Sequence, residues 1–493
     1  MDGAEGTRPV PSDAHRTADR TGRGRGGARA QLAVLAAAQF VIAADYNIVH
    51  VALPSIGTAA GFSEHDLQWV VSAYVVVTGG FLLFGGRAAD LLGRRRMFVT
   101  AAVLYAVASL AGGATAEPGV IVAARAAQGL GGALLFPATL SLISTLFAEG
   151  PARNRALAVW GAMGAFGLCA GSLAGGLLVD AFGWASVFYA NIPPALAIAA
   201  GALLLFPPDA AREPGRRFDA PGAVAVTGGA TLLVYTVVRG PQSGWLSPEV
   251  LGCGGLALLL LAAYARRERR FADPLTPPRL LRAAGVRTAV PTALVFGATF
   301  SALPYFLTLY LQRVAGLEPL ATGAAFLWPA IVVAVGARAG EWAVGRFDAA
   351  APLRYGLASG ALGTALLALA MTEDGGYLAL LPGLTLLSLA QGAVWTALWI
   401  VAADGIAPAD QGVASGTAST ALQLGGAVGL AVLVAVANAG VSGAAAEGPG
   451  AAGADGLRTT VFVVAGTLLA AALAYTARAR AARPRKAAPA MRR

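Results

Sequence analysis

Residues 86–96 read Gly-Arg-Ala-Ala-Asp-Leu-Leu-Gly-Arg-Arg-Arg. This stretch separates two long apolar runs, at 67–86 and 97–115. A helix needs roughly 20 apolar residues to cross the hydrocarbon core of a bilayer. The pattern therefore predicts two membrane spans joined by a short basic loop, with Gly86 and Gly93 allowing close backbone approach and a tight turn.

The composition of the whole chain agrees with membrane insertion. Of the 493 residues, 57% are hydrophobic and 13% are charged, and the mean hydropathy is +0.65. Soluble domains carry about 25% charged residues. Backbone polar groups in lipid must bond to one another, which leaves helices or closed barrels. The apolar runs here are continuous and not alternating, so we expect an all-α membrane protein.

Fourteen apolar runs along the chain are long enough to be spans. They lie at 32–53, 67–86, 97–115, 120–147, 156–179, 185–206, 219–238, 248–265, 286–312, 320–343, 353–371, 377–402, 411–438 and 458–477. An even count of spans puts both termini on the same side of the membrane.

The positions of the basic residues orient these spans. Of the 36 Lys and Arg residues, 32 fall in the two tails or in loops on the side of the termini. Loops rich in Lys and Arg stay in the cytoplasm. We therefore expect both termini to be cytoplasmic, and the net charge of +10 reflects membrane topology, with no nucleic-acid partner.

The spans group into two sets of six that flank an inserted pair. Span four contains Gln128-Gly129 and span twelve Gln391-Gly392, an offset of eight spans that suggests parallel repeats. The predicted segments are a disordered tail (1–30), a six-helix half (31–207), two inserted spans (208–265), a connector (266–285), a second six-helix half (286–477) and a basic tail (478–493).

The loop between spans two and three has the chemistry of a conformational latch. Asp90 can accept hydrogen bonds from a helix N-terminus in the other half, where the helix dipole favours a carboxylate. Arg94, Arg95 and Arg96 can pair with carboxylates or lipid phosphates. A plain basic loop explains the arginines but not the ordered Gly86–Asp90–Gly93–Arg94 spacing, so we favour the latch.

Asp45 and Arg125 are charged residues within the cores of predicted spans. Asp45 is in span one, where an isolated carboxylate is costly in its charged form, as a proton carrier requires. Arg125, in span four, keeps its proton and can neutralise Asp45. A static structural pair is the alternative to proton coupling. His50 lies about 7.5 Å further along the helix; it suits either a proton relay or simple packing.

Several classes of protein are disfavoured by the motifs that the sequence lacks. There is no Gly-Lys-Ser/Thr loop for nucleotide phosphates and no Cys/His cluster with metal-ligand spacing. No catalytic cluster of the kind a membrane acyltransferase needs is present, and no stretch is long enough for a soluble signalling domain. We expect a non-enzyme with no cofactor and no metal.

The ordered motifs resemble the major facilitator superfamily, and within it the fourteen-span drug:proton antiporters. Residues 86–96 resemble its signature loop, residues 44–54 its first-span motif, and Arg125 with Gln128 and Gly129 its fourth-span motif. The resemblance implies the major facilitator fold and a role of Arg125 in proton coupling. Residues 184–193 resemble the start of the sixth span.

The fifth span resembles the antiporter motif of that family through Gly167, Gly171, Gly175 and Gly176. The family's fifth helix lies between the halves and limits leakage. This sequence departs from the pattern, because Ser172 replaces the usual proline and Asn47 and His50 replace Thr and Asn in the first-span motif. These departures affect the substrate and the gating more than the fold.

Aromatic and amide side chains within the spans are candidates for a substrate cavity, since drug-like molecules favour aromatic walls with few polar groups. The candidates are Trp69, Tyr74, Gln128, Tyr305, Gln312, Trp328, Gln391, Trp395, Trp399 and Gln423.

Together these features predict a monomeric, proton-coupled antiporter that exports a small drug-like molecule or antibiotic across a bacterial cytoplasmic membrane. A related carrier that imports or exchanges a metabolite is the alternative. The scarcity of acids within the second-half spans favours neutral or anionic substrates, and the Ala- and Gly-rich composition suggests a GC-rich bacterium.

Overall fold

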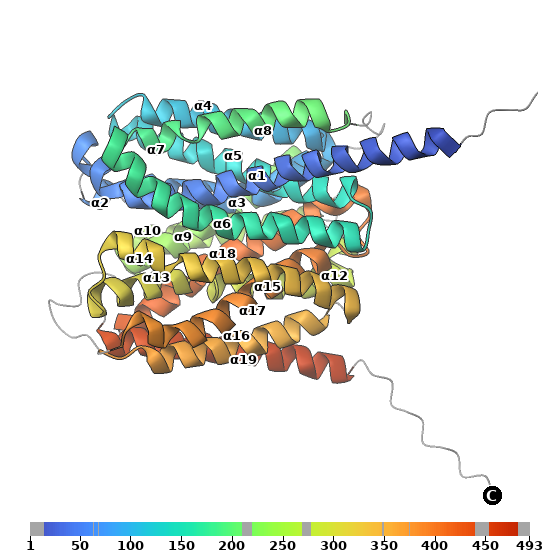
Figure 1. Ribbon diagram of the computed structural model, residues 1–493. Helices are drawn as coiled ribbons and strands as arrows, with labels where there is room; N and C mark the ends of the chain where they lie inside the picture. The colour runs from blue at the N-terminus through green and yellow to red at the C-terminus, as the bar shows by residue number, and fades with distance from the viewer. Residues whose placement is uncertain are drawn as a thin grey trace, which may run out of the picture.

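Figure 1 shows the computed structural model, a bundle of helices that run side by side. The structure describes residues 14–62, 64–67, 69–209, 219–268, 278–347, 350–373, 375–438 and 453–481, and every element in these ranges is a helix. Fourteen stretches of helix there are long and apolar enough to cross a membrane. The predicted all-α class and the predicted number of spans are confirmed.

The first eight spans are formed by ten helices, because α2 is a short turn and α7 and α8 together make span six. Their bounds are α1 (Ala14–Ala60), α2 (Glu64–Leu67), α3 (Trp69–Leu92), α4 (Arg94–Gly113), α5 (Pro118–Leu146), α6 (Pro151–Phe182), α7 (Ser186–Tyr189), α8 (Ile192–Leu205), α9 (Ala220–Ser243) and α10 (Pro248–Glu268). The helices α9 and α10 are the inserted pair.

The last six spans follow a short helix, α11 (Pro278–Arg282). Their elements are α12 (Ala284–Ala298), α13 (Leu303–Leu309), the π-helical η1 (Tyr310–Val314), α14 (Pro319–Ala325), α15 (Leu327–Arg346), α16 (Ala350–Ala370), α17 (Tyr377–Ala403), the 3₁₀ turn η2 (Pro408–Asp410), α18 (Gln411–Asn438) and α19 (Ala454–Ala481). Every predicted span overlaps one of the observed ones.

Both ends of the described chain lie at the same end of the bundle. We call the end where α1 begins and α19 ends the terminal face, and the other end the opposite face (Figure 1).

Helix α1 begins at Ala14, within the predicted disordered tail 1–30. No proline interrupts the helix between residues 14 and 30. Residues 1–13, 269–277 and 482–493, from the predicted tails and connector, lie outside the described residues.

The packing within the first six spans recurs in the last six. Helix α1 packs on α6, α3 on α5, and α4 on α5 and α8. Eight spans later, α12 packs on α18, α15 on α17, and α16 on α17 and α19. The predicted offset of eight spans therefore corresponds to a repeated pattern of helix contacts.

Glycines let the paired helices approach closely. A Cβ atom added to Gly171 of α6 would lie 2.3 Å from the Ala44 carbonyl oxygen of α1. In the corresponding pair, a Cβ on Gly425 of α18 would lie 2.1 Å from the Leu294 carbonyl of α12. Small residues at such contacts replace the hydrophobic effect as the source of helix association in lipid.

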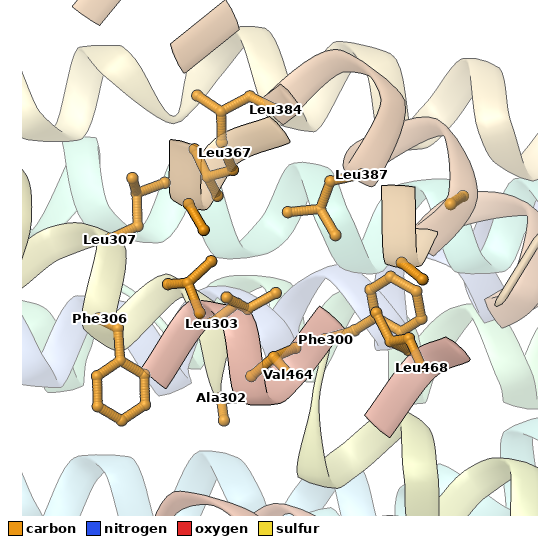
Figure 2. Packing of buried hydrophobic residues seen from close by; sticks show 14 of the residues in the cluster. Phe300, Ala302, Leu303, Phe306, Leu307, Leu367, Leu384, Leu387, Val464 and Leu468 are labelled. Carbon is orange, nitrogen blue, oxygen red and sulfur yellow. The ribbon is translucent and has the colours of Figure 1, made fainter. Parts of the chain in front are cut away.

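Bulky apolar residues fill the last six spans. In Figure 2, Phe300 lies beside Leu468 of α19, and Leu367 of α16 lies between Leu303 and Leu384 of α17; all five are at most 4% exposed. This dense packing ties the helices of the second half to one another.

The two groups of six spans meet along two helix pairs. Helix α3 packs on α18, and α6 packs on α15. By the eight-span offset, α3 corresponds to α15 and α6 corresponds to α18. The repeat therefore relates one of these two contacts to the other, as expected for repeats related by a pseudo-two-fold axis. The inserted α9 packs on both α3 and α18, so it covers one side of the junction.

One predicted loop is mostly helical. Residues 86–92 form the last turns of α3, and α4 begins at Arg94, so Gly93 alone joins the two helices. Its φ of 104° is accessible to glycine but strained for other residues. The intervening Ala and Leu residues are strong helix formers, which extends α3 to the glycine.

Candidate functional site

Asp45 and Arg125 form an ion pair in the interior of the first six spans. Asp45 comes from the middle of α1 and Arg125 from α5, and they are 0% and 1% exposed. Nη1 of Arg125 lies 2.7 Å from Oδ2 of Asp45. Arg125 is seven residues from the start of α5, or about 10 Å from the opposite face.

Arg125 also has partners other than Asp45. Its Nε donates to the Val70 carbonyl at 3.0 Å, and its Nη1 donates to Oε1 of Gln128 at 2.8 Å. The guanidinium carbon lies 4.4 Å from the ring centroid of Tyr74, a cation–π distance. Arg125 therefore has partners in α3 and α5 in addition to the carboxylate of Asp45.

The second carboxylate oxygen of Asp45 is held by Asn191, where span six begins. Asn191 Nδ2 donates to Oδ1 at 2.6 Å and to the Val187 carbonyl at 3.1 Å. Gln128 passes the network on, because its Nε2 donates to Ser109 Oγ at 2.8 Å. Neither Asn191 nor Ser109 was predicted as a site residue. Asn191 entered only as part of the sixth-span resemblance, and the only signal of Ser109 is a polar side chain within an apolar run.

His50 lies outside this network. Its ring contacts its own helix: Nδ1 bonds to the Tyr46 carbonyl, and the ring centroid lies 4.8 Å from that of Tyr46. The side chain is exposed, on a different face of α1 from the buried Asp45. A separation of five residues is 140° around a helix, which explains the divergence.

Two of the three departures from the family pattern in spans one and five contact each other. Asn47 Nδ2 donates to Ser172 Oγ at 3.1 Å and to the Leu168 carbonyl at 2.8 Å. Ser172 Oγ also donates to the Leu168 carbonyl, at 3.3 Å. A polar clamp between α1 and α6 therefore stands where the family has a proline.

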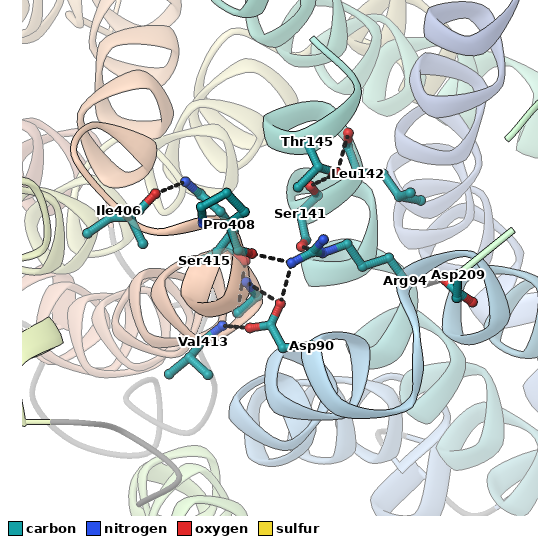
Figure 3. Close-up of polar contacts among 12 residues, drawn as sticks. Asp90, Arg94, Ser141, Leu142, Thr145, Asp209, Ile406, Pro408, Val413 and Ser415 are labelled. Atoms are coloured by element: carbon teal, nitrogen blue, oxygen red, sulfur yellow. Dashed lines mark hydrogen bonds and ion pairs between the residues drawn. The ribbon is translucent and has the colours of Figure 1, made fainter. Parts of the chain in front are cut away.

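At the terminal face, Asp90 binds the N-terminus of α18 (Figure 3). Its Oδ1 accepts the backbone N–H of Gly412 at 3.1 Å, and its Oδ2 accepts that of Val413 at 3.0 Å. The first N–H groups of a helix have no intrahelical partner and carry its positive dipole end. Gly86 allows the approach, since a Cβ there would lie 2.1 Å from the Gly412 carbonyl oxygen.

Arg94 ties the same contact to two further elements. Its Nη2 lies 3.2 Å from Asp90 Oδ1 and also donates to the Pro408 carbonyl of η2. Its Nε donates to Ser141 Oγ of α5 (Figure 3). Asp90 and Arg94 thus join the first six spans to the turn that precedes α18.

The other two arginines of the motif have a different partner. The backbone N–H groups of Arg95 and Arg96, at the start of α4, donate to Asp209 at 2.9 Å each. The Arg95 side chain donates to the Leu203 carbonyl at 2.6 Å. These contacts stay within the first six spans and fix the end of α8.

Three glycines of the fifth-span motif line the contact with α1. A Cβ on Gly167, Gly171 or Gly175 would lie 2.3–2.9 Å from a carbonyl oxygen of α1. Gly176 differs, because a Cβ there meets nothing within 4 Å. These three glycines therefore pack against α1, a helix of the same six-span group, while other faces of α6 contact α15 and α17.

The candidate cavity residues do not gather at one place. Tyr74 and Gln128 belong to the Arg125 network. Trp69 stacks on Tyr235 of the inserted α9. Trp328 donates to Thr385 Oγ1 at 2.9 Å, Tyr305 packs on Phe306, Gln312 is exposed in η1, and Gln391 and Gln423 are half-buried.

Trp395 belongs to an aromatic cluster between the two groups of spans. We define this Trp cluster as Trp160 of α6 with Trp395 and Trp399 of α17. The Trp160 and Trp395 rings are nearly parallel, at 11° and 6.0 Å between centroids. Phe136 of α5 packs on Trp160 and Trp399, and Phe296 of α12 on Trp395. Trp160 was not among the predicted cavity residues.

The described residues contain neither a disulfide bond nor a cluster of metal-binding side chains. Cys169 and Cys253 are both free thiols. No three His, Cys, Asp or Glu side chains in the described ranges lie close enough together to hold a metal ion.

Known proteins resemble this chain over most of its length. Residues 35–430 match the family model of the Major Facilitator Superfamily. The cephamycin export protein CmcT of Amycolatopsis lactamdurans is 38% identical over 88% of this chain and 90% of its own. The puromycin resistance protein pur8 of Streptomyces alboniger is also 38% identical, over 82% of this chain and 80% of its own.

Solved structures share the fold at low sequence identity. The human organic anion transporter MFSD10 superposes with a TM-score of 0.65 at 17% identity, covering 91% of this chain and 99% of its own. The proton:xylose symporter XylE gives a TM-score of 0.65 at 14% identity, covering 91% and 95%. The fourteen helices, the repeated packing and the match over 35–430 lead to one assignment: this chain is a secondary transporter of the major facilitator superfamily.

Proposed function

We propose that this chain exports a small drug-like molecule or antibiotic from the bacterial cytoplasm in exchange for protons. The observation that carries the proposal is the buried Asp45–Arg125 pair, at 2.7 Å, in a chain whose relatives are named for antibiotic export or resistance. Ionisable residues at such depth in a membrane protein are costly and are retained for function.

The bonds of Asp45 support a proton-exchange step. Asp45 accepts hydrogen bonds at both of its oxygens, from Arg125 Nη1 and Asn191 Nδ2. Protonation of Asp45 removes the negative charge that attracts Arg125 and so weakens the ion pair. Arg125 then keeps the Val70 carbonyl, Gln128 and the face of Tyr74. These contacts are present together with the ion pair, and we expect them to hold the Arg125 side chain in place when Asp45 is neutral.

The orientation of the chain follows from its charges. The terminal face carries most of the Lys and Arg residues, which favours a cytoplasmic location for both termini. At that face, Asp90 and Arg94 join α3 to Gly412, Val413 and Pro408. We propose that these bonds form a latch that holds the cytoplasmic side closed and breaks when that side opens, so that the site alternates in access.

Export fits the relatives better than import does. The cephamycin export protein and the puromycin resistance protein align over more than 80% of this chain. Likeness to the xylose symporter, at 14% identity, concerns the fold alone. We propose a monomer in the cytoplasmic membrane whose substrate is neutral or anionic, since Asp45 is already paired with a cation.

Drug susceptibility of a sensitive bacterial host tests this function. We expect the wild-type chain to raise the inhibitory concentration of at least one antibiotic in a broad panel. Asp45→Asn, which keeps the size of the side chain but cannot carry the proton, should remove this protection. Glu117→Gln is the matched control, because Glu117 is an exposed acid at the start of α5.

Membrane amounts of both variants must match the wild type. Protection by Asp45→Asn equal to that of the wild type would contradict the role of Asp45. No protection against any compound would contradict the drug-export proposal itself.

A further inference from the structure

The hydroxyl of Tyr105 is a buried polar group with no hydrogen-bond partner. Tyr105 comes from the middle of α4 and is 0% exposed. Among the described residues, no donor or acceptor has bonding geometry with its hydroxyl oxygen. A buried hydroxyl without a partner is unfavourable, and phenylalanine would fill the same apolar space without it. The hydroxyl therefore points to a partner that it binds in another state of the transporter.

This hydroxyl faces the Asp45–Arg125 pair. The Tyr105 ring packs with Tyr74 and with Val41. Val41 lies one turn before Asp45 on α1, on the same side of that helix. The Tyr105 hydroxyl also interacts electrostatically with the Asp45 carboxyl and with Tyr74. Tyr105 and Asp45 are therefore placed to bond without a rearrangement of α1 and α4.

The network around the ion pair also fixes the position of Tyr105. Gln128, which accepts from Arg125, donates to Ser109 Oγ at 2.8 Å. Ser109 Oγ in turn donates to the Tyr105 carbonyl at 2.7 Å. Gly131 of α5 lets the ring approach, since a Cβ there would lie 3.1 Å from Tyr105 Cδ2. Tyr105 is thus held against the same helix that carries Arg125.

A protonated Asp45 needs an acceptor for its O–H group. Its two side-chain partners in the structure, Arg125 Nη1 and Asn191 Nδ2, are both donors. A guanidinium has no acceptor atom. Asn191 Nδ2 also donates to the Val187 carbonyl, which keeps the amide nitrogen turned toward Asp45. A tyrosine hydroxyl, by contrast, has lone pairs and can accept.

We propose that Tyr105 accepts a hydrogen bond from protonated Asp45 and thereby raises the affinity of the transporter for its proton. The proton stays on the Asp45 carboxyl, and Tyr105 keeps its own proton, which can turn toward the Tyr74 hydroxyl. Tyr105 is therefore a positioning residue for the proton. This inference rests on the proton exchange proposed above and adds a residue that tunes it.

Loss of this acceptor should weaken proton binding. Tyr105→Phe removes a bond made only by the protonated form of Asp45. The pH at which half of the Asp45 side chains are protonated should therefore fall, by about half a unit to one unit.

Other titratable groups also face the ion pair. They are Tyr74 of α3 and, on α1 itself, Tyr46 and His50. Of these, histidine alone ordinarily titrates near neutral pH. The fall caused by Tyr105→Phe should therefore persist in a His50→Gln background.

Infrared spectroscopy of the full chain in lipid nanodiscs tests the inference without substrate or gradient. The carbonyl stretch of protonated carboxylic acids is followed against pH, and the band of Asp45 is the one that Asp45→Asn removes. We expect a lower midpoint in Tyr105→Phe than in the wild type. Its melting temperature should match that of the wild type, because the hydroxyl forms no bond in this structure.

Tyr310→Phe is the matched control. It removes an equally buried hydroxyl, which donates to the Thr372 carbonyl in the second group of spans, and it should leave the midpoint of Asp45 unchanged. Equal midpoints in the wild type and Tyr105→Phe would overturn the role of Tyr105, and so would an equal shift in Tyr310→Phe. A wild type with no titrating Asp45 band would overturn proton exchange as well. Failure to export any drug would leave the titration unchanged, so the two proposals fail separately.

Discussion

At the scale of single residues, the two members of the Asp45–Arg125 pair depend on each other. Both charged side chains are buried, and Arg125 Nη1 lies 2.7 Å from Asp45 Oδ2. Removing one partner leaves an uncompensated buried charge, which typically costs about 3–5 kcal/mol. Neutralising both residues removes that penalty.

We therefore predict a non-additive effect on stability. Arg125→Gln should lower the melting temperature of the purified protein, and the double variant Asp45→Asn with Arg125→Gln should recover most of the loss. Thermal unfolding in detergent measures this. A double variant that is less stable than Arg125→Gln alone would show that the two charges do not compensate each other.

We expect transport to depend on the geometry of the Arg125 side chain as well as on its charge. The side chain donates to Asp45, Gln128 and Val70 from a planar fork and stacks on Tyr74. Lysine keeps the charge but cannot reproduce this geometry. We predict that Arg125→Lys lowers the transport rate at least tenfold while the protein still folds. Near-normal rates in vesicles containing Arg125→Lys would reduce the role of Arg125 to its charge.

At the scale of helix pairs, the contact of α1 with α6 sets the geometry around Asp45. Gly171 lies against the Ala44 carbonyl, next to the acid in the chain, whereas Gly176 faces open space. Overpacking a close helix contact costs about 1–3 kcal/mol. The same motif therefore contains both a sensitive glycine and a tolerant one.

We predict that Gly171→Ala destabilises the protein and impairs transport, because its methyl group would push α1 and Asp45 away from α6. Gly176→Ala is the control and should be silent. Melting temperature and transport rate, measured side by side, check both variants. Equal behaviour of the two alanines would contradict the close contact of α1 and α6.

The sequence predicted the helical elements better than it predicted their contacts. Apolar runs long enough to cross the bilayer predict the spans. Gly93 predicts a turn because glycine tolerates a positive φ, and the structure has a positive φ at this residue. Contacts between distant segments leave weaker signals. The Asn47–Ser172 bond links α1 to α6, but each residue alone read only as a departure from a family motif. Asn191 likewise belonged to a family motif, but its bond to Asp45 was not predicted, and Trp160 was not predicted at all.

At the scale of the whole molecule, the latch and the Trp cluster both lie toward the terminal face, and Asp45 and Arg125 lie deeper. At the terminal face, Asp90 holds the α18 N-terminus and so joins the two groups of spans. A carboxylate at a helix N-terminus contributes about 0.3–1 kcal/mol, and up to about 2 kcal/mol when partly buried. The latch is strong enough to bias a conformational equilibrium and weak enough to break.

Neutralising Asp90 should shift this equilibrium toward opening of the terminal face. Spin labels at Leu92 and Ala407, which are both exposed at that face, report the separation. We predict a larger fraction of long distances in Asp90→Asn than in the wild type. Asp404→Asn, at an exposed acid close to η2, is the control. Identical distance distributions in Asp90→Asn and wild type would contradict the latch.

The central claim concerns proton exchange at Asp45, and proteoliposomes test it most directly. The wild type and Asp45→Asn are compared with the compound found in the susceptibility screen, first under an imposed pH gradient and then without one. We predict that the wild type concentrates the compound under the gradient, whereas Asp45→Asn only exchanges it between equal pools. Accumulation by Asp45→Asn at the wild-type level under the gradient would contradict the account.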